Sequence, residues 1–273
     1  MKTHLFKLEC LTDLHVGDGE TNYSVIDNEV QKDTVLTDVP IIHASGVKGA
    51  IKEHFERIWG INDTRIKNIF GDKDGAGDYK FFSALCVARP LRVTDGDRPY
   101  VLATGADVLE SFSTLLKGLG LSGFFNYQEI APGAGQNTVL ADGQDTALAD
   151  GFLSNVPGIE IEGVRAKYIG SSSNSFSSAS LMQFARIIGK EFAIAKSLRD
   201  YDLPARARNQ LENGKSKNLW YEEVVPHKSI FYFVIITPTD DCVLDFESSG
   251  PVQFGGNASI GNGYTTITEV FSV

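Results

Sequence analysis

The chain has 273 residues, of which 42% are hydrophobic and 10% aromatic, so it can bury the core of one large domain or two small ones. Its formal net charge of −10 argues against a protein that binds nucleic acid by itself, because affinity for phosphate comes mainly from Lys and Arg. The three cysteines, Cys10, Cys86 and Cys242, are widely spaced and form no CxxC motif, which argues against a disulfide framework and a structural zinc site.

No segment predicts contact with a membrane. The longest apolar run, IFYFVII at 230–236, is far shorter than the roughly 20 residues of a membrane-spanning helix. MKTHLFKLEC at 1–10 alternates in polarity and lacks the apolar core of a signal peptide. Together with the unpaired cysteines, these features predict a cytoplasmic protein.

The first predicted element is a strand. HLFKLEC, residues 4–10, alternates apolar and polar side chains, which is the pattern of a half-buried strand. A glycine turn at 17–19 and an unpatterned polar connection that reaches Pro40 follow. The connection contains YSVIDNEVQKD, residues 23–33, with an acid at Asp27. Because long structureless connections are uncommon inside compact domains, we expect this one to have a function.

A helix is predicted next. SGVKGAIKEHFERIW, residues 45–59, repeats apolar side chains at helical spacing, and Ser45 is the expected N-cap. Lys48 and Lys52 lie near its beginning, where backbone N–H groups and the helix dipole favour anions, although a solvated lysine pair is the simpler alternative. The five histidines are not spaced as a metal cluster, but His43, directly before the helix, is a candidate ligand contact.

The middle of the chain predicts a strand and two helices. KFFSALCVARPLRV at 80–93 is typical of a strand, and VLESFSTLLKGLG at 108–120 of a helix ended by glycine. SLMQFARIIGKEFAIAK at 180–196 keeps its apolar residues in helical phase. The segment 131–158 is rich in glycine and small residues and lacks Lys and Arg, which indicates an insertion or a mobile loop.

A hairpin is predicted over 204–223, with Asn213 and Gly214 at its turn, because Asn-Gly is the strongest short hairpin signal. Residues 186–217 contain eight Lys and Arg against four Asp and Glu, a local excess of four positive charges in an acidic chain. The hairpin therefore offers the basic surface that the composition as a whole lacks. Its basic residues are Arg206, Arg208, Lys215 and Lys217.

The chain ends with a buried strand at 229–237, a glycine loop FGGNASIGNGY at 254–264 and a last strand, TTITEV. No GK[ST] follows the glycines, so a nucleotide-cofactor loop is disfavoured, and close approach of backbone N–H groups to phosphates or a plain turn remain. The order of elements predicts an α+β sandwich with helices on one face of an antiparallel sheet, built on a ferredoxin-like core with long insertions.

Several motifs in order resemble RAMP proteins of type III CRISPR effectors. They are HVGDG, VPIIHASGVKGAIK, NIFGD with the strand that follows it, NLWYEEVVP and VQFGGNASIGNGY. The series is most similar to the repeated backbone subunit of the type III-B, or Cmr, complex, and is weakest over 95–175. The family usually has Pro-Gly where this chain has His43-Ala44, and a basic residue is common where Asn262 stands.

The resemblance implies one RAMP domain over 1–273 with a ferredoxin-like, RRM-like core, an insertion at about 95–175 and a thumb hairpin at about 203–223. It implies copies of the chain stacked in a filament along CRISPR RNA, with complementary target RNA and other Cmr subunits as partners. The thumb would displace a base pair of the guide–target duplex. The residues expected to contact RNA are His43, Ser45, Lys48, Lys52, Arg206, Arg208, Lys215, Lys217, Gly255, Gly256, Gly261 and Gly263.

The resemblance also implies endonucleolytic cleavage of target RNA at regular intervals. The family's cleaving aspartate falls on Asp27, with Tyr221 and Glu223, or Glu222, near it. RNA can be cut by its own 2′-OH once that oxygen, the phosphorus and the leaving oxygen are in line, and a displaced nucleotide permits this geometry.

Asp27 alone is a weak base for a sugar hydroxyl, so we expect it to hold a divalent metal, Mg²⁺ or Mn²⁺, largely through water and RNA phosphates. Two alternatives stay open: a non-catalytic RNA-binding scaffold, and a guide-processing RAMP nuclease that uses a His or a Tyr/Lys site without metal.

Overall fold

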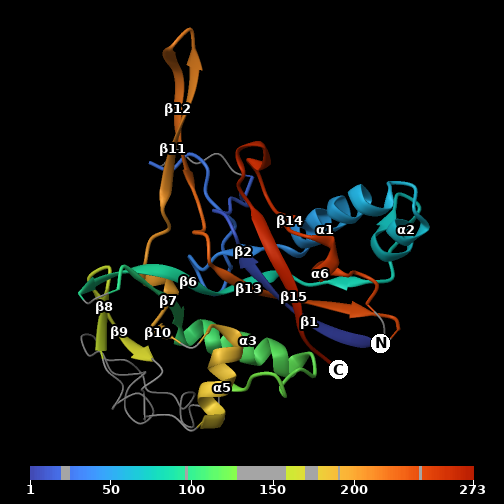
Figure 1. The fold of residues 1–273 in the computed structure, drawn as a ribbon, viewed down its shortest axis with the longest axis horizontal. Helices are drawn as coiled ribbons and strands as arrows, with labels where there is room; N and C mark the ends of the chain where they lie inside the picture. The colour runs from blue at the N-terminus through green and yellow to red at the C-terminus, as the bar shows by residue number, and fades with distance from the viewer. Residues whose placement is uncertain (20–24, 96–97, 128–157, 170–177, 190, 240–241) are drawn as a thin grey trace. The chain divides into compact units, whose positions relative to one another are not determined.

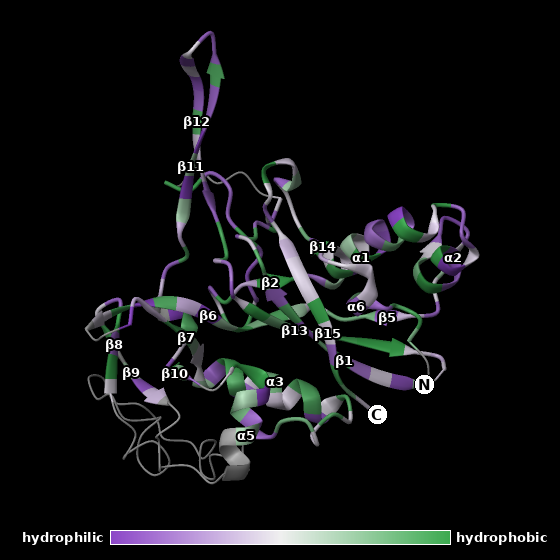
Figure 2. Ribbon diagram, viewed as in Figure 1, coloured by the Kyte–Doolittle hydropathy of each residue, from purple (hydrophilic) through white to green (hydrophobic). Residues whose placement is uncertain are grey.

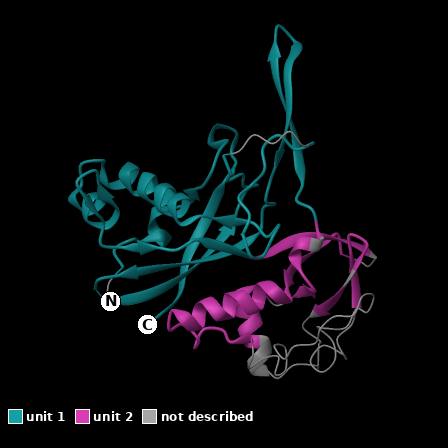
Figure 3. Cartoon of the chain, turned by 180° about the vertical axis from the view of Figure 1, so that it is seen from behind, with its two compact units in different colours: residues 1–86, 202–273 teal, residues 87–201 magenta. Residues whose placement is uncertain are grey.

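A computed structural model describes the chain except for residues 20–24, 96–97, 128–157, 170–177, 190 and 240–241 (Figure 1). The chain divides into two compact units, one made of residues 1–86 and 202–273 and the other of residues 87–201 (Figure 3). We call them unit 1 and unit 2. The insertion predicted at about 95–175 falls inside unit 2, and nearly all of the segment 131–158 lies outside the described residues. The single-domain organisation stays a prediction.

Unit 1 is built on an antiparallel sheet in the order β14-β15-β1-β13. The strand predicted at 4–10 is confirmed as β1, in which His4, Phe6, Leu8 and Cys10 are buried. The short strand β5 pairs with β13, and β2 pairs with the beginning of β6, which runs on into unit 2. The bounds are β1 Lys2–Cys10, β2 Ile41–Ile42, β5 Lys80–Phe81, β6 Ala84–Asp95, β13 Ile230–Thr237, β14 Val252–Gln253 and β15 Tyr264–Ser272.

An aromatic cluster joins this sheet to its helices. Phe6 of β1 stacks on Phe233 of β13 with ring centroids 5.3 Å apart, and Phe246 of α6 meets Phe6 edge-on at 5.3 Å. Phe55 of α1 packs on Phe246 with ring centroids 5.6 Å apart, so α1 covers the sheet with its apolar side. Hydrophobic and hydrophilic residues accordingly alternate along α1 in Figure 2. The helices of unit 1 are α1 Ala44–Trp59, α2 Thr64–Phe70, α6 Phe246–Ser249 and the 3₁₀ turn η2 Ala258–Ile260, and the small hairpin β3 Gly71–Asp72 and β4 Gly75–Ala76 follows α2.

The predicted N-cap of α1 is wrong. The helix begins at Ala44 with His43 in the N-cap position, and the His43 side chain makes no capping hydrogen bond. The Ala44 N–H instead donates to Ser83 Oγ at 3.1 Å, and the His43 N–H donates to Gln31 Oε1 at 2.9 Å. Tertiary partners therefore satisfy the amides at this end, which is why a local capping rule missed the boundary.

The predicted hairpin is present in unit 1. Strands β11 (Ala205–Glu212) and β12 (Lys215–Glu223) pair antiparallel and extend away from the sheet of that unit (Figure 1). Asn213 and Gly214 both adopt positive φ, 52° and 77°, as the tight hairpin turn requires. The strand register slips by one residue between Gln210 and Leu211.

Unit 2 combines the rest of β6 with a mixed sheet, in which β6 pairs with β7 antiparallel and β7 with β10 parallel. The helix predicted at 180–196 is wrong in its second half, because α5 ends at Ile187 and Phe192–Ala195 is the buried strand β10. Gly189, with a φ of 141°, separates the two, and a short run of apolar residues fits a strand buried on both faces as well as a helix. The remaining elements are β7 Tyr100–Gly105, α3 Ala106–Gly118, β8 Gly158–Ile161, β9 Val164–Ile169, α5 Ser178–Ile187 and η1 Leu198–Asp200.

In the described parts of both units the fold is mixed α/β with a large sheet, and no helix there is long and apolar enough to cross a membrane.

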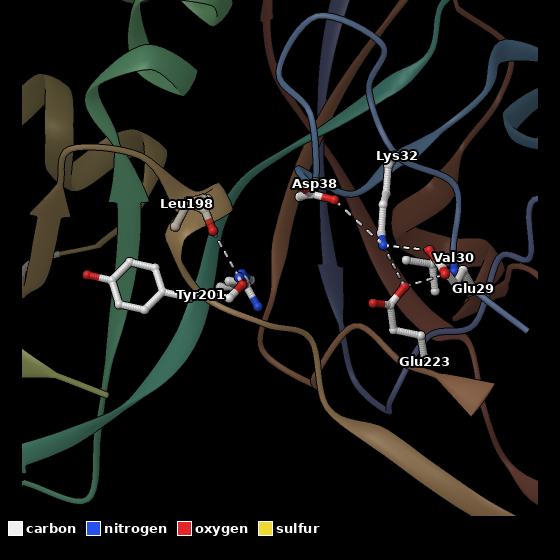
Figure 4. A network of polar contacts seen from close by, with 8 residues as sticks. Glu29, Val30, Lys32, Asp38, Leu198, Tyr201 and Glu223 are labelled. Atoms are coloured by element: carbon white, nitrogen blue, oxygen red, sulfur yellow. Dashed lines mark hydrogen bonds and ion pairs between the residues drawn. The ribbon is translucent and has the colours of Figure 1, made fainter. Parts of the chain in front are cut away.

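Arg89 of β6 is fully buried in unit 2. Its Nη2 donates to the carbonyl oxygen of Leu198, at 3.0 Å, and to that of Tyr201, and both of these residues are drawn in Figure 4.

Replacing Phe55 by Ala tests the aromatic cluster. Because Phe55 is 1% exposed and touches Phe246, the change should lower the free energy of unfolding by about 3–5 kcal/mol. Ile58→Ala is the control on the same helix, since Ile58 is 48% exposed, and it should cost about 1 kcal/mol or less. Urea unfolding followed by circular dichroism measures both, and equal losses would contradict the packing described.

Candidate functional site

The segment that contains Asp27 is paired with the hairpin. The N–H groups of Asp27 and Asn28 both donate to the carbonyl oxygen of Tyr221, at 3.1 and 3.2 Å, and the Glu223 N–H donates to the Asn28 carbonyl oxygen at 2.9 Å. Further along, the Gln31 N–H donates to the Val16 carbonyl oxygen at 2.8 Å. The connection predicted to be unpatterned contains no helix or strand over residues 25–40, but it is ordered by isolated backbone bridges and by burial of Val30 and Val39.

The Asp27 carboxylate is fixed by the same strand. Its Oδ2 accepts a hydrogen bond from the Tyr221 N–H at 2.8 Å, and the residue is half-buried. Among the described residues, no hydrogen bond to the other oxygen, Oδ1, is found. The Tyr221 side chain beside it is 39% exposed. The hydrogen bond from the hairpin thus sets the orientation of the carboxylate.

Glu223 faces the same segment and has partners of its own (Figure 4). It is 8% exposed, and its Oε2 accepts the Val30 N–H at 3.2 Å and lies 3.3 Å from Lys32 Nζ. Lys32 also pairs with Glu29 at 2.8 Å and Asp38 at 3.8 Å. Burial alone would lower the pKa of Lys32, but Glu29 and Glu223 outweigh it and raise that pKa above its ordinary value. Glu223 therefore shares one cation with two other acids, and the Lys32 ion pair and the Val30 N–H fix its position.

The segment 13–15 holds the other side of the hairpin base. His15 is 8% exposed, and its Nδ1 donates to the Glu223 carbonyl oxygen at 2.7 Å, which fixes the proton on Nδ1. Asp13 accepts from Arg206 Nη2 at 2.9 Å and from the His227 N–H at 3.0 Å. Burial opposes ionisation of Asp13, but these donors outweigh it and hold its pKa below the usual range. Arg206, predicted to contact RNA, is thus engaged within the protein.

The glycine loop has two kinds of glycine. A Cβ on Gly255 would lie 2.1 Å from the His15 carbonyl oxygen, and one on Gly263 would lie 2.0 Å from the Phe254 carbonyl oxygen, and both residues have positive φ. Gly261 has positive φ in open space. Gly256 has neither constraint, since the nearest atom to an added Cβ is 3.9 Å away. The protein's own backbone thus accounts for three of the four predicted RNA-contact glycines. Gly256 has space at its Cα, although its N–H donates to the His15 carbonyl oxygen at 2.9 Å.

Glu222 connects the hairpin to this loop. It is 7% exposed, and its Oε1 accepts Trp220 Nε1–H at 2.7 Å while its Oε2 accepts Asn257 Nδ2–H at 2.8 Å. Asn257 lies within the glycine loop with a φ of 64°. The two neighbouring acids of β12 therefore contact two different loops.

The predicted residues at the start of α1 line a separate hollow of about 660 Å³. Ser45, Lys48 and Lys52 form one wall and the turn between β3 and β4 the other. Lys52 lies 3.7 Å from Glu56, whereas Lys48 has no ion pair among the described residues. His43 is exposed. His43 directly precedes the helix that forms this basic wall, and its N–H donates to Gln31 Oε1 of the Asp27 segment. The start of α1 and the Asp27 segment are therefore in contact.

The remaining predicted cations lie on the hairpin itself. Arg208 stands opposite Trp220 in the register, and Lys215 stands opposite Glu212 beside the turn. Lys217 pairs with Glu212 at 3.0 Å, with both side chains more than half exposed, so the pair is free to exchange partners. These three side chains remain available to a polyanion.

The described residues offer a divalent metal the Asp27 carboxylate as a candidate ligand. They contain no group of three His, Cys, Asp or Glu side chains that could hold an ion. Within the described part of the chain Asp27 Oδ1 has no hydrogen-bond partner, whereas the carboxylates of Glu222 and Glu223 have partners. Mg²⁺ commonly keeps several waters and binds through one or two carboxylates plus substrate phosphates, which is the mode that this site permits.

Sequence reasoning missed the residues that hold the site together. Lys32 lies in a run of polar residues that does not distinguish it from its neighbours. Its spacing of three residues from Glu29 is only a weak indication of an ion pair. Gln31, His15 and Asn257 act through partners far along the chain, such as Glu223, for which one sequence carries no signal.

Comparison with known proteins places the chain in a family. Residues 7–265 match the RAMP superfamily. The protein named CRISPR system Cmr endoribonuclease Cmr4 from Pyrococcus furiosus is 26% identical over 294 aligned residues, which cover 98% of this chain and 96% of that protein.

Solved structures share the fold. A chain of the type III-B Cmr-beta complex bound to cognate target RNA has a TM-score of 0.69 at 20% identity, with 97% of this chain and 96% of that chain covered. Oligomeric Cmr4 from Pyrococcus furiosus has a TM-score of 0.62 at 19% identity, with 99% of both chains covered. At these identities the likeness establishes the fold alone.

Two glycine variants separate structural from ligand-contacting glycines. Gly255→Ala should lower the free energy of unfolding by more than about 2 kcal/mol, because it meets a carbonyl oxygen and a left-handed backbone. Gly256→Ala should leave stability unchanged or raise it by up to about 1 kcal/mol. Thermal unfolding of the RNA-free chain measures both, and similar losses would contradict the distinction.

Lys32→Met tests the ion-pair cluster of Figure 4. Removing the ammonium leaves Glu29 and Glu223 without their cation, so the free energy of unfolding should fall by about 1–3 kcal/mol. Lys7→Met is the matched control, because Lys7 is also 24% exposed and also pairs with a glutamate, Glu9. It should cost about 1 kcal/mol or less in the same urea titration. A control loss as large as that of Lys32→Met would remove the special role of the cluster.

Proposed function

The chain belongs to the RAMP superfamily, and from that membership we propose that it is the repeated backbone subunit of a type III-B CRISPR effector. In this role it binds guide RNA and cleaves complementary target RNA as an endoribonuclease. The full-length similarity to a Cmr endoribonuclease supports the activity, and the likeness to chains from a Cmr complex bound to target RNA and from an oligomeric relative supports the partners. Those partners are guide RNA, target RNA, further copies of this chain and other Cmr subunits.

The proposal includes the finer architecture. The core of unit 1 would be ferredoxin-like, and the β11–β12 hairpin would be the thumb that enters the guide–target duplex. The half-exposed cations Arg208, Lys215 and Lys217, with Lys48 at the start of α1, supply local positive charge on a chain of net charge −10. Binding would then depend on assembly, because each copy adds only a few such cations to a chain of net charge −10.

The observation that carries the proposal is the carboxylate of Asp27, which a hydrogen bond orients at the base of the hairpin. The Tyr221 N–H fixes Oδ2, so the open Oδ1 has a set direction. A nucleotide displaced by the thumb would be unstacked beside it, as cleavage requires.

Cleavage itself is an attack by the RNA on its own phosphate. The 2′ oxygen forms a bond to phosphorus, the bond from phosphorus to the 5′ oxygen breaks, and the hydroxyl proton leaves while the 5′ oxygen gains one. The products are a 2′,3′-cyclic phosphate and a 5′-hydroxyl. We assign Asp27 to orienting the 2′-OH and, with the exposed Tyr221 ring against the displaced nucleotide, to holding the in-line geometry.

Asp27 would also hold a divalent metal, Mg²⁺ or Mn²⁺, through Oδ1. Such an ion lowers the pKa of a hydroxyl and stabilises negative charge on phosphate oxygens. Glu223 lies behind Asp27: its contacts with Val30 and Lys32 position the segment, and this is the part we assign to it.

Asp27→Asn tests the assignment. An amide oxygen can still accept the Tyr221 N–H, so the segment should keep its structure while the negative charge is lost. In complexes assembled with guide RNA, we expect labelled target RNA to bind as before and cleavage to fall by at least about a hundredfold. Removal of divalent ions with EDTA should stop cleavage by the wild type.

Asp33→Asn is the control, because the Asp33 carboxylate also accepts backbone N–H groups in the same segment but makes no contact with the hairpin. Cleavage by Asp27→Asn at the wild-type rate would refute the assignment. Target held intact by the wild type under several metals would favour the non-catalytic scaffold, and cleavage of repeat RNA by the isolated chain would favour guide processing.

A further inference from the structure

Two adjacent glutamates of β12 contact opposite sides of the site. Successive residues of a strand point to opposite faces, so Glu222 and Glu223 diverge from one backbone position. Glu222 contacts the glycine loop through Asn257, and Glu223 contacts the Asp27 segment through Val30 and Lys32. A movement of the glycine loop therefore acts on Glu222, and a movement of the Asp27 segment acts on the adjacent residue, Glu223.

The partners of the two acids differ in kind. Glu223 forms an ion pair with the ammonium of Lys32, which it shares with Glu29 and Asp38. Glu222, although only 7% exposed, has neutral donors, the Trp220 indole and the Asn257 amide, and no ion pair among the described residues. A buried carboxylate without a cation depends strongly on each hydrogen bond that it accepts. The Asn257 contact is therefore the sensitive end of the connection.

The connection continues to Asp27 through the backbone. Residue Asn28 bridges Glu222 in parallel pairing, and the Glu223 N–H donates to the Asn28 carbonyl oxygen. Two residues nearer the hairpin tip, the Tyr221 N–H fixes the Asp27 carboxylate. Any shift of β12 at 221–223 is thus passed to Asp27 through at least two hydrogen bonds.

We propose that Asn257 and Glu222 are positioning residues that couple the glycine loop to Asp27. This inference rests on the proposed function. RNA bound against the glycine loop at Gly256 sets the position of Asn257, Asn257 sets that of Glu222, and β12 sets the orientation of the Asp27 carboxylate. Cleavage competence at Asp27 thereby depends on occupancy of the glycine loop.

Asn257→Gly is the test variant. Glycine accepts the left-handed backbone at a φ of 64°, so the loop keeps its conformation and only the amide donor to Glu222 is lost. In complexes with guide RNA and saturating labelled target, we expect the single-turnover cleavage rate to fall about tenfold while the Kd for target changes less than about twofold. Asn257→Asp, which places a carboxylate against Glu222, should lower the rate at least as far.

Two further measurements separate coupling from a general loss of structure. In a double-mutant cycle, Asn257→Gly should have little added effect on cleavage once Glu222 is Ala, because the interaction is already gone. Hydrogen exchange at the amides of Asp27, Asn28 and Val30, measured on the guide-bound complex without target, should speed up in Asn257→Gly. Thermal unfolding of that variant should remain a single transition with a moderately lower midpoint, because Glu222 loses one donor but keeps Trp220.

The outcomes distinguish this inference from the function on which it rests. Wild-type cleavage and exchange in Asn257→Gly would overturn the coupling while leaving the nuclease assignment intact. A fall in target affinity that accounts for the whole loss of rate would also overturn it, because Asn257 would then be an RNA contact. If Asp27→Asn still cleaves, the proposed function fails, and the exchange measurement still decides whether Asn257 orders the Asp27 segment.

Discussion

Backbone hydrogen bonds between the Asp27 segment and the edge of β12 fix the position of the other groups in the site. Amides and carbonyls of Asp27, Asn28, Tyr221 and Glu223 satisfy one another there. Because the hairpin extends from unit 1 at this point, the edge of β12 would be open without the segment. One set of contacts therefore closes an exposed edge, anchors the hairpin and orients a carboxylate.

Charge compensation decides which carboxylates remain available for chemistry. Glu222 and Glu223 are almost fully buried and have specific donors, whereas Asp27 keeps one oxygen without a partner among the described residues. Lys32 matters because an unpaired Glu223 at this depth would be costly and would disturb the segment that it orders. The availability of Asp27 thus follows from how completely its neighbours are satisfied.

The glycine loop shows that one residue type can serve two purposes within a few positions. Gly255 and Gly263 allow the protein backbone to approach itself, which a side chain would prevent. Gly256 is free of that constraint, and Asn257 beside it reaches the hairpin. Gly255 and Gly263 thus pack the loop against the protein, while Asn257 connects the loop to the hairpin. Such a loop can transmit the effect of a bound ligand to the rest of the site.

Local patterns in the sequence determined β1, the body of α1 and the Asn-Gly hairpin, because alternation, helical spacing and turn chemistry are local properties. The motif series indicated the family, and the resemblance to that family identified Asp27 as the candidate catalytic residue. The N-cap at His43 and the strand at 192–195 were decided by tertiary partners, since a Ser83 hydroxyl and burial on both faces outweighed local preference. The same holds for the contacts of Lys32 and Asn257, which join residues about 190 and 35 positions apart, because long-range pairing depends on the folded backbone and not on neighbouring sequence.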